Sequence, residues 1–441
     1  MLDAQVGRDS GKPSAALIEC GGSIVGSAGV SHAMWREKSR LGESSRGREI
    51  CLFIFALGGL TLWGASIVRA QNGSVAQEPG AQATQSFEEL AGRAQAASDA
   101  NRIPEAIRLY ERATALRPSW SEGWWNLGTM LFDSNQIVKA HDAFLHFVSV
   151  EQKQPGPGFG MLGLTEFELK DYPNALLAVE HGRALGLGNN PEFVHRVLYV
   201  DGILNNFLAQ PEIALARLTL LANQYAAEHP ETPRDVVLEN TELLDAFGLA
   251  ALRIRELPAE VSSHQAALVR QAGHAQALSA LQYRVAAGEE IKQLVAQHPS
   301  QPGVHYLYGV FLLKEDPSSS IAEFRREIAV SPRDPSARIQ LALEFLRSSD
   351  YKQGLTYARE AIALAPDNFV AHVACGRLWL GLGNTDLALR ELRTAVRLSP
   401  GSPDAHFALS RALSDAGQRA EAAQERAEFE RLKAISDAAN R

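Results

Sequence analysis

A spacing of 34 residues recurs near the C-terminus of this chain. Three sets of equivalent residues keep this step, namely Pro332, Pro366 and Pro400; Leu341, Cys375 and Leu409; and Ala342, Gly376 and Ser410. Repetition at a period of about 20–50 residues indicates an array of similar supersecondary units. One such unit cannot bury its own apolar face, so neighbouring units must stack. The spacing therefore predicts a repeat array, which needs no single hydrophobic core even in a chain of 441 residues.

The residues within each unit follow a pattern as well. A small residue stands at position 8, further small residues stand near positions 20 and 27, and a proline stands at position 32. This pattern resembles the tetratricopeptide repeat, and Trp124-x2-Leu127-Gly128 is its closest match here. The resemblance implies an all-α fold, an α-solenoid of tandem helix-turn-helix repeats coiled into a right-handed superhelix.

The repeat positions divide the chain into segments. Residues 87–228 predict an N-terminal array, residues 301–434 predict a C-terminal array, and residues 229–300 predict an irregular helical connector. The end of the connector, with Ala287, Ile291 and Leu294, is similar to the second helix of a degenerate unit. Residues 71–86 are polar and favour a flexible linker, and residues 435–441 form a polar tail. Residues 1–49 show no periodicity and are interpreted as a disordered extension, with Met34 as an alternative start.

One segment is typical of a targeting signal. Residues 50–68 carry no charge and follow five basic residues, Arg36, Lys38, Arg40, Arg46 and Arg48. Val68-Arg69-Ala70 then suits a signal peptidase, which would leave Gln71 as the new N-terminus. An uncleaved membrane anchor is the alternative, because about 17–25 apolar residues span a bilayer, and a buried core helix is a third interpretation. The first two predict a bacterial exported protein, periplasmic or anchored with its repeats outside the cytoplasmic membrane.

Several kinds of chemistry are not supported. The formal charge of -8 argues against a nucleic-acid surface. Gly158-x-Gly160-x-x-Gly163 has the letters of a dinucleotide fingerprint, but a helix precedes it and its residues occupy repeat positions. Cys375 occupies a position that holds Leu in neighbouring units, so a packed core thiol is predicted.

No catalytic motif was found either. His305, His372 and His406 occupy position 4 of three units, and packed helices lie about 8–10 Å apart, so these side chains cannot share a metal ion. We expect them to pack between helices. The repeats occupy every stretch long enough for a catalytic domain. The sequence therefore predicts a protein that is not an enzyme and holds no metal and no cofactor.

The resemblance also implies which residues face a partner, because positions 2, 5, 9, 12 and 13 of each first helix line the concave groove in this family. In the first array these positions include acidic and aromatic residues: Asp99, Asp133, Glu168, Trp125, Phe132 and Phe167. In the second array they include mainly basic and aromatic residues: Lys314, Arg347, Arg377, Arg411, Tyr306 and Phe407. Two peptide-binding grooves of opposite charge are one interpretation, and an ordinary solvated face is the other.

These observations lead to three functional hypotheses. The first is a scaffold or assembly factor at the cell envelope that binds peptide or helical segments of other proteins, acidic ones in the second array. It would bind no nucleic acid and would contact a membrane only through residues 50–68 if these are retained. The second is an accessory subunit of an envelope enzyme or secretion machine. The third is a cryptic enzyme in residues 234–300, where Glu239, Glu242 and Asp245 would lie on one helix.

Overall fold

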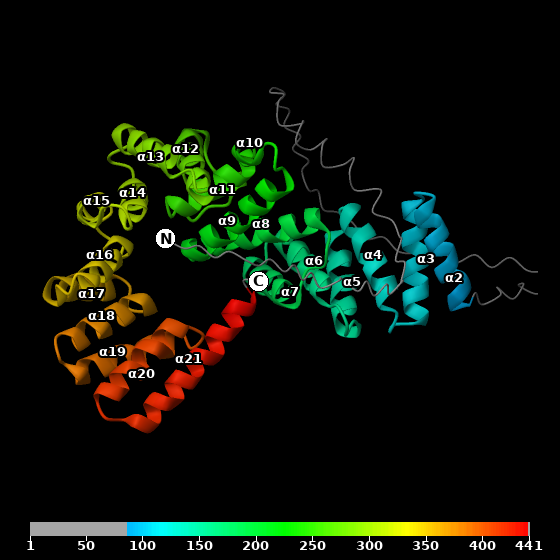
Figure 1. Cartoon of the computed structure of the whole chain (residues 1–441). Coiled ribbons are helices and arrows are strands. Elements are labelled where there is room, and N and C mark those ends of the chain that lie inside the picture. The colour runs from blue at the N-terminus through cyan, green and yellow to red at the C-terminus, as the bar shows by residue number, and fades with distance from the viewer. Residues whose placement is uncertain (1–85, 440–441) are drawn as a thin grey trace, which may run out of the picture. The chain divides into compact units, whose positions relative to one another are not determined.

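The computed structural model describes residues 86–439, and within this range it contains helices and no strand (Figure 1). The expected all-α fold class is confirmed. The predictions made for residues 1–49 and 50–70, for most of the linker, for Met34 and for Gln71 lie outside the described residues. Among the described helices, none has the length and apolar composition needed to cross a bilayer.

The chain divides into two compact units, with the boundary between Ala113 and Thr114. In the first unit, α2 (Phe87–Asp99) begins after Ser86, whose side chain accepts a hydrogen bond from the Glu89 amide at 3.2 Å. The next helix, α3 (Ile103–Leu116), crosses the boundary near its end. Tyr110 of α3 donates a hydrogen bond to Gln95 of α2 at 2.9 Å, so the two helices form one hairpin.

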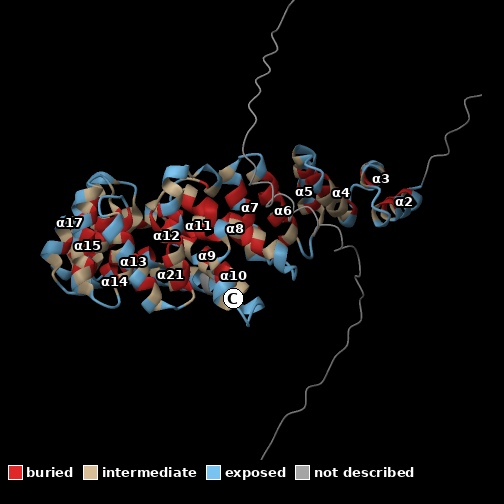
Figure 2. Ribbon diagram, turned by 90° about the horizontal axis from the view of Figure 1, so that it is seen from above, coloured by how far each residue is buried: buried red, intermediate tan, exposed pale blue. Residues whose placement is uncertain are grey.

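The second unit is a series of helical hairpins, each packed on the next. The regular hairpins are α4 (Ser121–Asp133) with α5 (Ile137–Val150), α6 (Gly156–Glu168) with α7 (Tyr172–Leu185), α8 (Pro191–Phe207) with α9 (Pro211–Glu228), α14 (Val304–Leu312) with α15 (Pro317–Val330), α16 (Ser336–Arg347) with α17 (Tyr351–Leu364), α18 (Phe369–Gly381) with α19 (Thr385–Leu398), and α20 (Pro403–Asp415) with α21 (Arg419–Ala439). Buried residues gather where these helices face one another (Figure 2).

The turn inside most hairpins has one backbone geometry. After α4, Asn135 adopts φ 59°, its amide donates to Phe132 O at 2.9 Å, and the Gln136 amide donates to Leu131 O at 2.8 Å. After α18, Gly383 adopts φ 76° and the same two bonds form. This is the Schellman motif, which pairs the last carbonyls of a helix and needs a left-handed residue. The turn therefore favours Gly or Asn at that point.

The small residue at position 8 lies where the two helices of a hairpin touch. A Cβ atom added to Gly128 would be 2.7 Å from the Phe144 ring, and one added to Gly376 would be 2.5 Å from Leu392 Cγ. The three glycines of the Gly158–Gly163 motif lie buried within α6, which confirms the expected helical context. Gly163 faces Val179 of its own hairpin, whereas Gly158 faces Phe147 of α5 and Gly160 faces Phe193 of α8. Small residues at these positions let the helix backbones approach closely.

Residues 229–300 form α10 (Pro233–Leu238), α11 (Thr241–Ala251), a short 3₁₀ turn (Pro258–Glu260), α12 (Ser263–Ala280) and α13 (Arg284–Gln297). The contact between α11 and α12 is unusually close, since a Cβ at Gly248 would be 1.9 Å from Val269 O. Gln282, at φ 67°, separates α12 from α13 in sequence that favours helix throughout. Ala287, Ile291 and Leu294 are buried, as in the second helix of a regular hairpin.

Candidate functional site

Two arginines and a phenylalanine lie exposed on neighbouring first helices of the second array. Arg377 of α18 and Arg411 of α20 are 34 residues apart, and these two helices pack against each other. Among the described residues, neither arginine has an ion-pair partner. Phe407 precedes Arg411 by four residues, so both lie on the same face of α20. Phe407 is 42% exposed and rests on Phe429 of α21 at 5.2 Å between ring centroids. We call Arg377, Phe407 and Arg411 the second array's first-helix face.

The other residues predicted for this face behave differently. Lys314 is exposed just after α14. Arg347 is exposed but pairs with Glu344 of its own helix at 2.8 Å, and this hydrogen bond raises the pKa of the Arg347 guanidinium. Asp415 is exposed at the end of α20.

Tyr306 does not lie at an exposed surface. Its side chain is buried, and its hydroxyl accepts hydrogen bonds from Arg253 and from Gln340, each at 3.2 Å. The Arg253 guanidinium also stacks on the ring, 4.8 Å from its centroid. Burial raises the pKa of the Tyr306 hydroxyl. The prediction that Tyr306 supplies an exposed aromatic contact is therefore wrong, because α15 and α16 pack against its side chain and Arg253 of the connector stacks on its ring.

In the first array, a cation occupies the predicted acidic face. The Arg196 guanidinium of α8 stacks on the Phe132 ring at 4.8 Å and lies 3.8 Å from Glu168. Asp133 is exposed, yet the surrounding protein raises the pKa of its carboxyl against the opposing effect of Arg196. The structure thus brings Phe132, Asp133 and Glu168 together. The positive charge beside them belongs to Arg196, which comes from a later hairpin.

Sequence reasoning missed Arg196, although a signal for it existed. If Gly202 is position 8 of its unit, Arg196 is position 2, one of the inward positions implied by the family resemblance. The three remaining candidates of the first array are spread out. Trp125 packs on Phe144 and Phe147 within its hairpin, and Phe167 packs on Tyr172. Asp99, in the first compact unit, is exposed and accepts a hydrogen bond from Gln95 at 2.8 Å.

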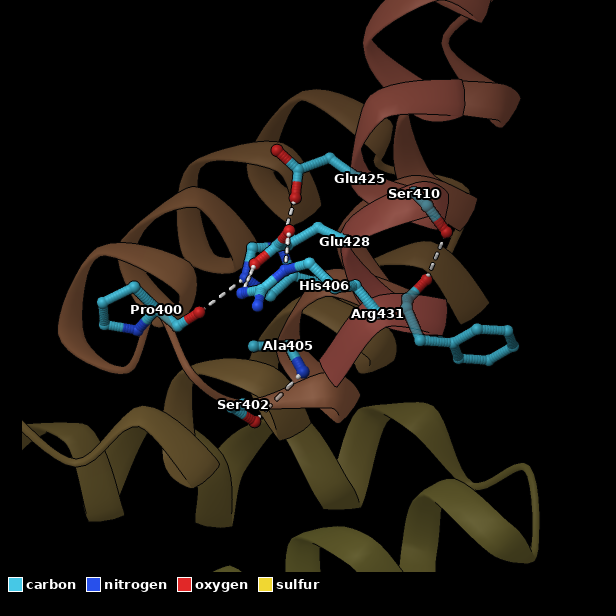
Figure 3. Close-up of polar contacts among 9 residues, drawn as sticks. Pro400, Ser402, Ala405, His406, Ser410, Glu425, Glu428 and Arg431 are labelled. Atoms are coloured by element: carbon cyan, nitrogen blue, oxygen red, sulfur yellow. Dashed lines mark hydrogen bonds and ion pairs between the residues drawn. The ribbon is translucent and has the colours of Figure 1, made fainter. Parts of the chain in front are cut away.

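The three position-4 histidines form identical polar clamps, of which Figure 3 shows the one at His406. His406 Nδ1 lies 2.6 Å from Glu425 Oε2, and its Nε2 lies 2.9 Å from Pro400 O. The carbonyl belongs to the loop before α20, the imidazole to α20, and the carboxylate to α21. Each clamp therefore ties together the end of one unit and both helices of the next.

The corresponding distances at His372 and His305 are the same, 2.6 Å and 2.9 Å. The partners are Glu391 and Pro366 for His372, and Glu323 and Pro299 for His305. In each clamp the imidazole lies between a carboxylate oxygen and a backbone carbonyl oxygen, both of which are hydrogen-bond acceptors. In the unit between them, Arg338 replaces histidine and bonds Glu360 at 3.0 Å and Asp334 O at 3.2 Å. The expectation that these histidines pack between helices is confirmed.

The carboxylates considered for a cryptic enzyme do not converge. Glu239 caps α10 and lies outside α11, so the prediction that it shares one helix with Glu242 and Asp245 is wrong. Asp245 forms a two-bond ion pair with Arg270 of α12. Within residues 86–439, no group of three or more His, Cys, Asp or Glu side chains is placed to hold a metal ion.

Comparison with known proteins identifies the repeat. A family model described as the tetratricopeptide repeat matches residues 92–148, 339–403 and 374–434. The human protein O-mannosyl-transferase TMTC3 is 30% identical over 92 residues, which are 21% of this chain. The chain spans 10% of the length of this curated relative.

Some solved structures also match part of this chain. MamA from Desulfovibrio magneticus RS-1 is 18% identical with a TM-score of 0.35, over 38% of this chain and 97% of that one. YrrB, described as a TPR protein with an unusual peptide-binding site, is 17% identical with a TM-score of 0.32, over 39% of this chain and 89% of that one.

Proposed function

We propose that this tetratricopeptide repeat protein is a non-enzymatic scaffold that binds segments of other proteins, and that the second array's first-helix face takes acidic, partly apolar segments. One observation carries this proposal: Arg377 and Arg411 are exposed, have no ion-pair partner within the described part of the chain, and lie beside the exposed Phe407. Neighbouring positive charges attract carboxylates over a screening distance of about 8–10 Å. An exposed aromatic ring supplies contact area that slows release of the bound segment.

The test is a charge reversal. Arg377→Glu with Arg411→Glu should weaken capture of a fluorescent peptide rich in Glu and Leu, measured by anisotropy, and should flatten the dependence of the association rate on salt concentration. The melting temperature should not fall, because exposed charges contribute little to stability.

The matched control reverses Arg390 and Arg397, two exposed arginines of α19 with no ion-pair partner among the described residues. Arg393 is unsuitable as a control because it pairs with Glu421 of α21 at 3.1 Å. If both double variants weaken binding equally, the first-helix face has no special role.

We further propose that the protein works at the cell envelope after export. The support is the basic and then apolar sequence of residues 36–68 followed by Val68-Arg69-Ala70. Protein purified from the envelope fraction should then begin at Gln71 if the signal is cleaved, or retain residues 50–68 in a membrane pellet. A soluble cytoplasmic protein that begins at Met1 or Met34 would contradict the location and leave the binding proposal standing.

A further inference from the structure

A pair of adjoining pockets lies along α17, on the second-helix side of the second array. The first has a volume of about 430 Å³ and is lined by α17 alone, from Lys352 to Ala363. The second has a volume of about 510 Å³ and is lined by α17, α18 and α19. Both share Arg359 and Ala363 as lining residues, so they form one continuous recess. We call it the α17 recess. It is separate from Arg377, Phe407 and Arg411, which do not line it.

The floor of the recess is apolar. Cys375 lines it and is itself buried, like the larger Leu341 and Leu409 at the equivalent positions of neighbouring units. Burial, together with the nearby Glu391 carboxylate, raises the pKa of the Cys375 thiol to about 12. The thiol is therefore neutral and acts as a small apolar group.

The rim of the recess is open because a small residue stands there. Ala363 of α17 lines both pockets and is exposed, whereas the residue 34 positions later, on α19, is Arg397. The remaining apolar lining is contributed by Leu355, Ile362, Trp379 and Leu387. A volume of this size accommodates one large aliphatic or aromatic side chain, and pockets of about 300–1,000 Å³ are the usual range for ligand sites.

The charges around the recess are not balanced. Its two carboxylates are already engaged, since Glu391 lies 2.6 Å from His372 and Glu360 lies 3.0 Å from Arg338. Lys352 and Arg359 are exposed, and neither has an ion-pair partner among the described residues. Lys352 and Arg359 are therefore the charged groups of the recess that can pair with a ligand.

We propose that the α17 recess is a second docking site, which takes an acidic segment of a partner protein that inserts one large apolar side chain over Cys375. The apolar side chain packs against Ile362, Ala363 and Trp379 of the lining, and carboxylates beside it pair with Lys352 and Arg359. Desolvated apolar anchors of this kind supply most of the affinity of an interface, while the surrounding charges speed association.

A photo-reactive peptide tests the site directly. The probe is a 13-residue peptide of Ala and Glu with one central photo-leucine, with a Lys version and a version with Ala at the centre for comparison. Irradiation with the full chain, followed by mass spectrometry, should place the crosslinks in α17, α18 and α19 at the lining residues. The Lys version and the Ala version should bind at least about 10-fold more weakly.

Two filling variants separate occupancy of the recess from damage to the fold. Cys375→Leu restores the residue of the neighbouring units, and Ala363→Leu fills the recess from the exposed side of α17. Each should reduce probe affinity about 10-fold or more while the melting temperature is kept. Ala423→Leu, at an exposed site on α21, is the matched control and should bind as the parent chain does. Arg359→Glu should weaken binding and reduce its salt dependence.

The possible outcomes distinguish this site from the first-helix face. Crosslinks in the recess that survive Arg377→Glu with Arg411→Glu support the second site even if the first face binds nothing. Crosslinks confined to the neighbourhood of Phe407, or full affinity in both filling variants, overturn it and leave the function proposed above unaffected.

Discussion

At the residue scale, the charged groups inside the protein join helices to one another. Asp201 of α8 is completely buried, and its Oδ2 lies 3.2 Å from Nε of both Arg183 on α7 and Arg217 on α9. Asn205 donates to the other carboxylate oxygen at 2.6 Å. One carboxylate therefore links two adjacent hairpins, and the histidine clamps do the same in the second array.

Removal of Asp201 should be strongly destabilising. Asp201→Ala removes the buried carboxylate on which two largely buried guanidinium groups converge, which should lower the free energy of unfolding by about 3–5 kcal/mol. Urea unfolding followed by circular dichroism measures this change. Lys292→Ala, which breaks an exposed pair with Glu289, should change it by no more than about 0.5 kcal/mol. Similar losses in both variants would show that Asp201 is not the critical link.

The clamps predict which replacement of histidine is tolerated. His372→Leu leaves the Glu391 carboxylate and the Pro366 carbonyl without a donor, at a cost of about 1–3 kcal/mol. His372→Arg should retain most of the stability, because Arg338 bonds a carboxylate and a loop carbonyl in the neighbouring unit. Thermal melts of both variants compare them. Equal destabilisation by Leu and Arg would mean that packing of the ring, not its two hydrogen bonds, is what matters.

At the element scale, two features determine the geometry of a hairpin: the turn between its two helices and the point where these helices come closest. The left-handed residue after the first helix reverses the chain, and the small residue at position 8 fixes how near the second helix comes. These two features lie on different parts of the hairpin, so a substitution can disturb one without the other.

Gly376 should tolerate no large side chain. A Cβ atom there would lie 2.5 Å from Leu392 Cγ and 3.2 Å from Ala388 O, so Gly376→Leu must push α18 and α19 apart. Overpacking of this kind should cost about 1–3 kcal/mol or more, measured by thermal unfolding. Gly401→Leu is the control, since no atom lies within 4 Å of a Cβ added there. An unchanged melt for Gly376→Leu would remove this residue from the helix contact.

At the scale of the whole molecule, each hairpin of the second compact unit packs chiefly on its neighbours in the chain. Stability in such an array is a sum of the units and of the interfaces between them. The last helix of the described array, α21, packs on α20 of its own hairpin, and no further described hairpin covers its other side. Most of its residues from Glu421 to Ala434 are exposed.

Hydrogen exchange of the full chain should therefore vary along the array. Amides of α21 beyond Arg431 should exchange with little protection, and amides of α16 and α18 should be the best protected of the second array, because units at an end open locally more easily than units within it. Mass spectrometry of peptic fragments resolves these regions. Uniform protection from α14 to α21 would indicate one cooperative core instead.

Much of this architecture could be predicted because it is local. The period of 34 residues and the small residue at position 8 can be read from one unit and its neighbours in the sequence, and a stack of helical hairpins follows from them. The burial of Cys375 followed in the same way, since its position holds leucine in adjacent units.

The candidate sites depended instead on contacts between units. Tyr306 occupies an inward position of its unit, yet Arg253 from the connector covers it. Glu168 of the first array was predicted to face a partner, but the Arg196 that pairs with it comes from α8. The second pocket of the α17 recess is lined by three helices of two successive units. A repeat period shows which residues are equivalent in successive units. Which side chains reach across an interface depends on how those units stack.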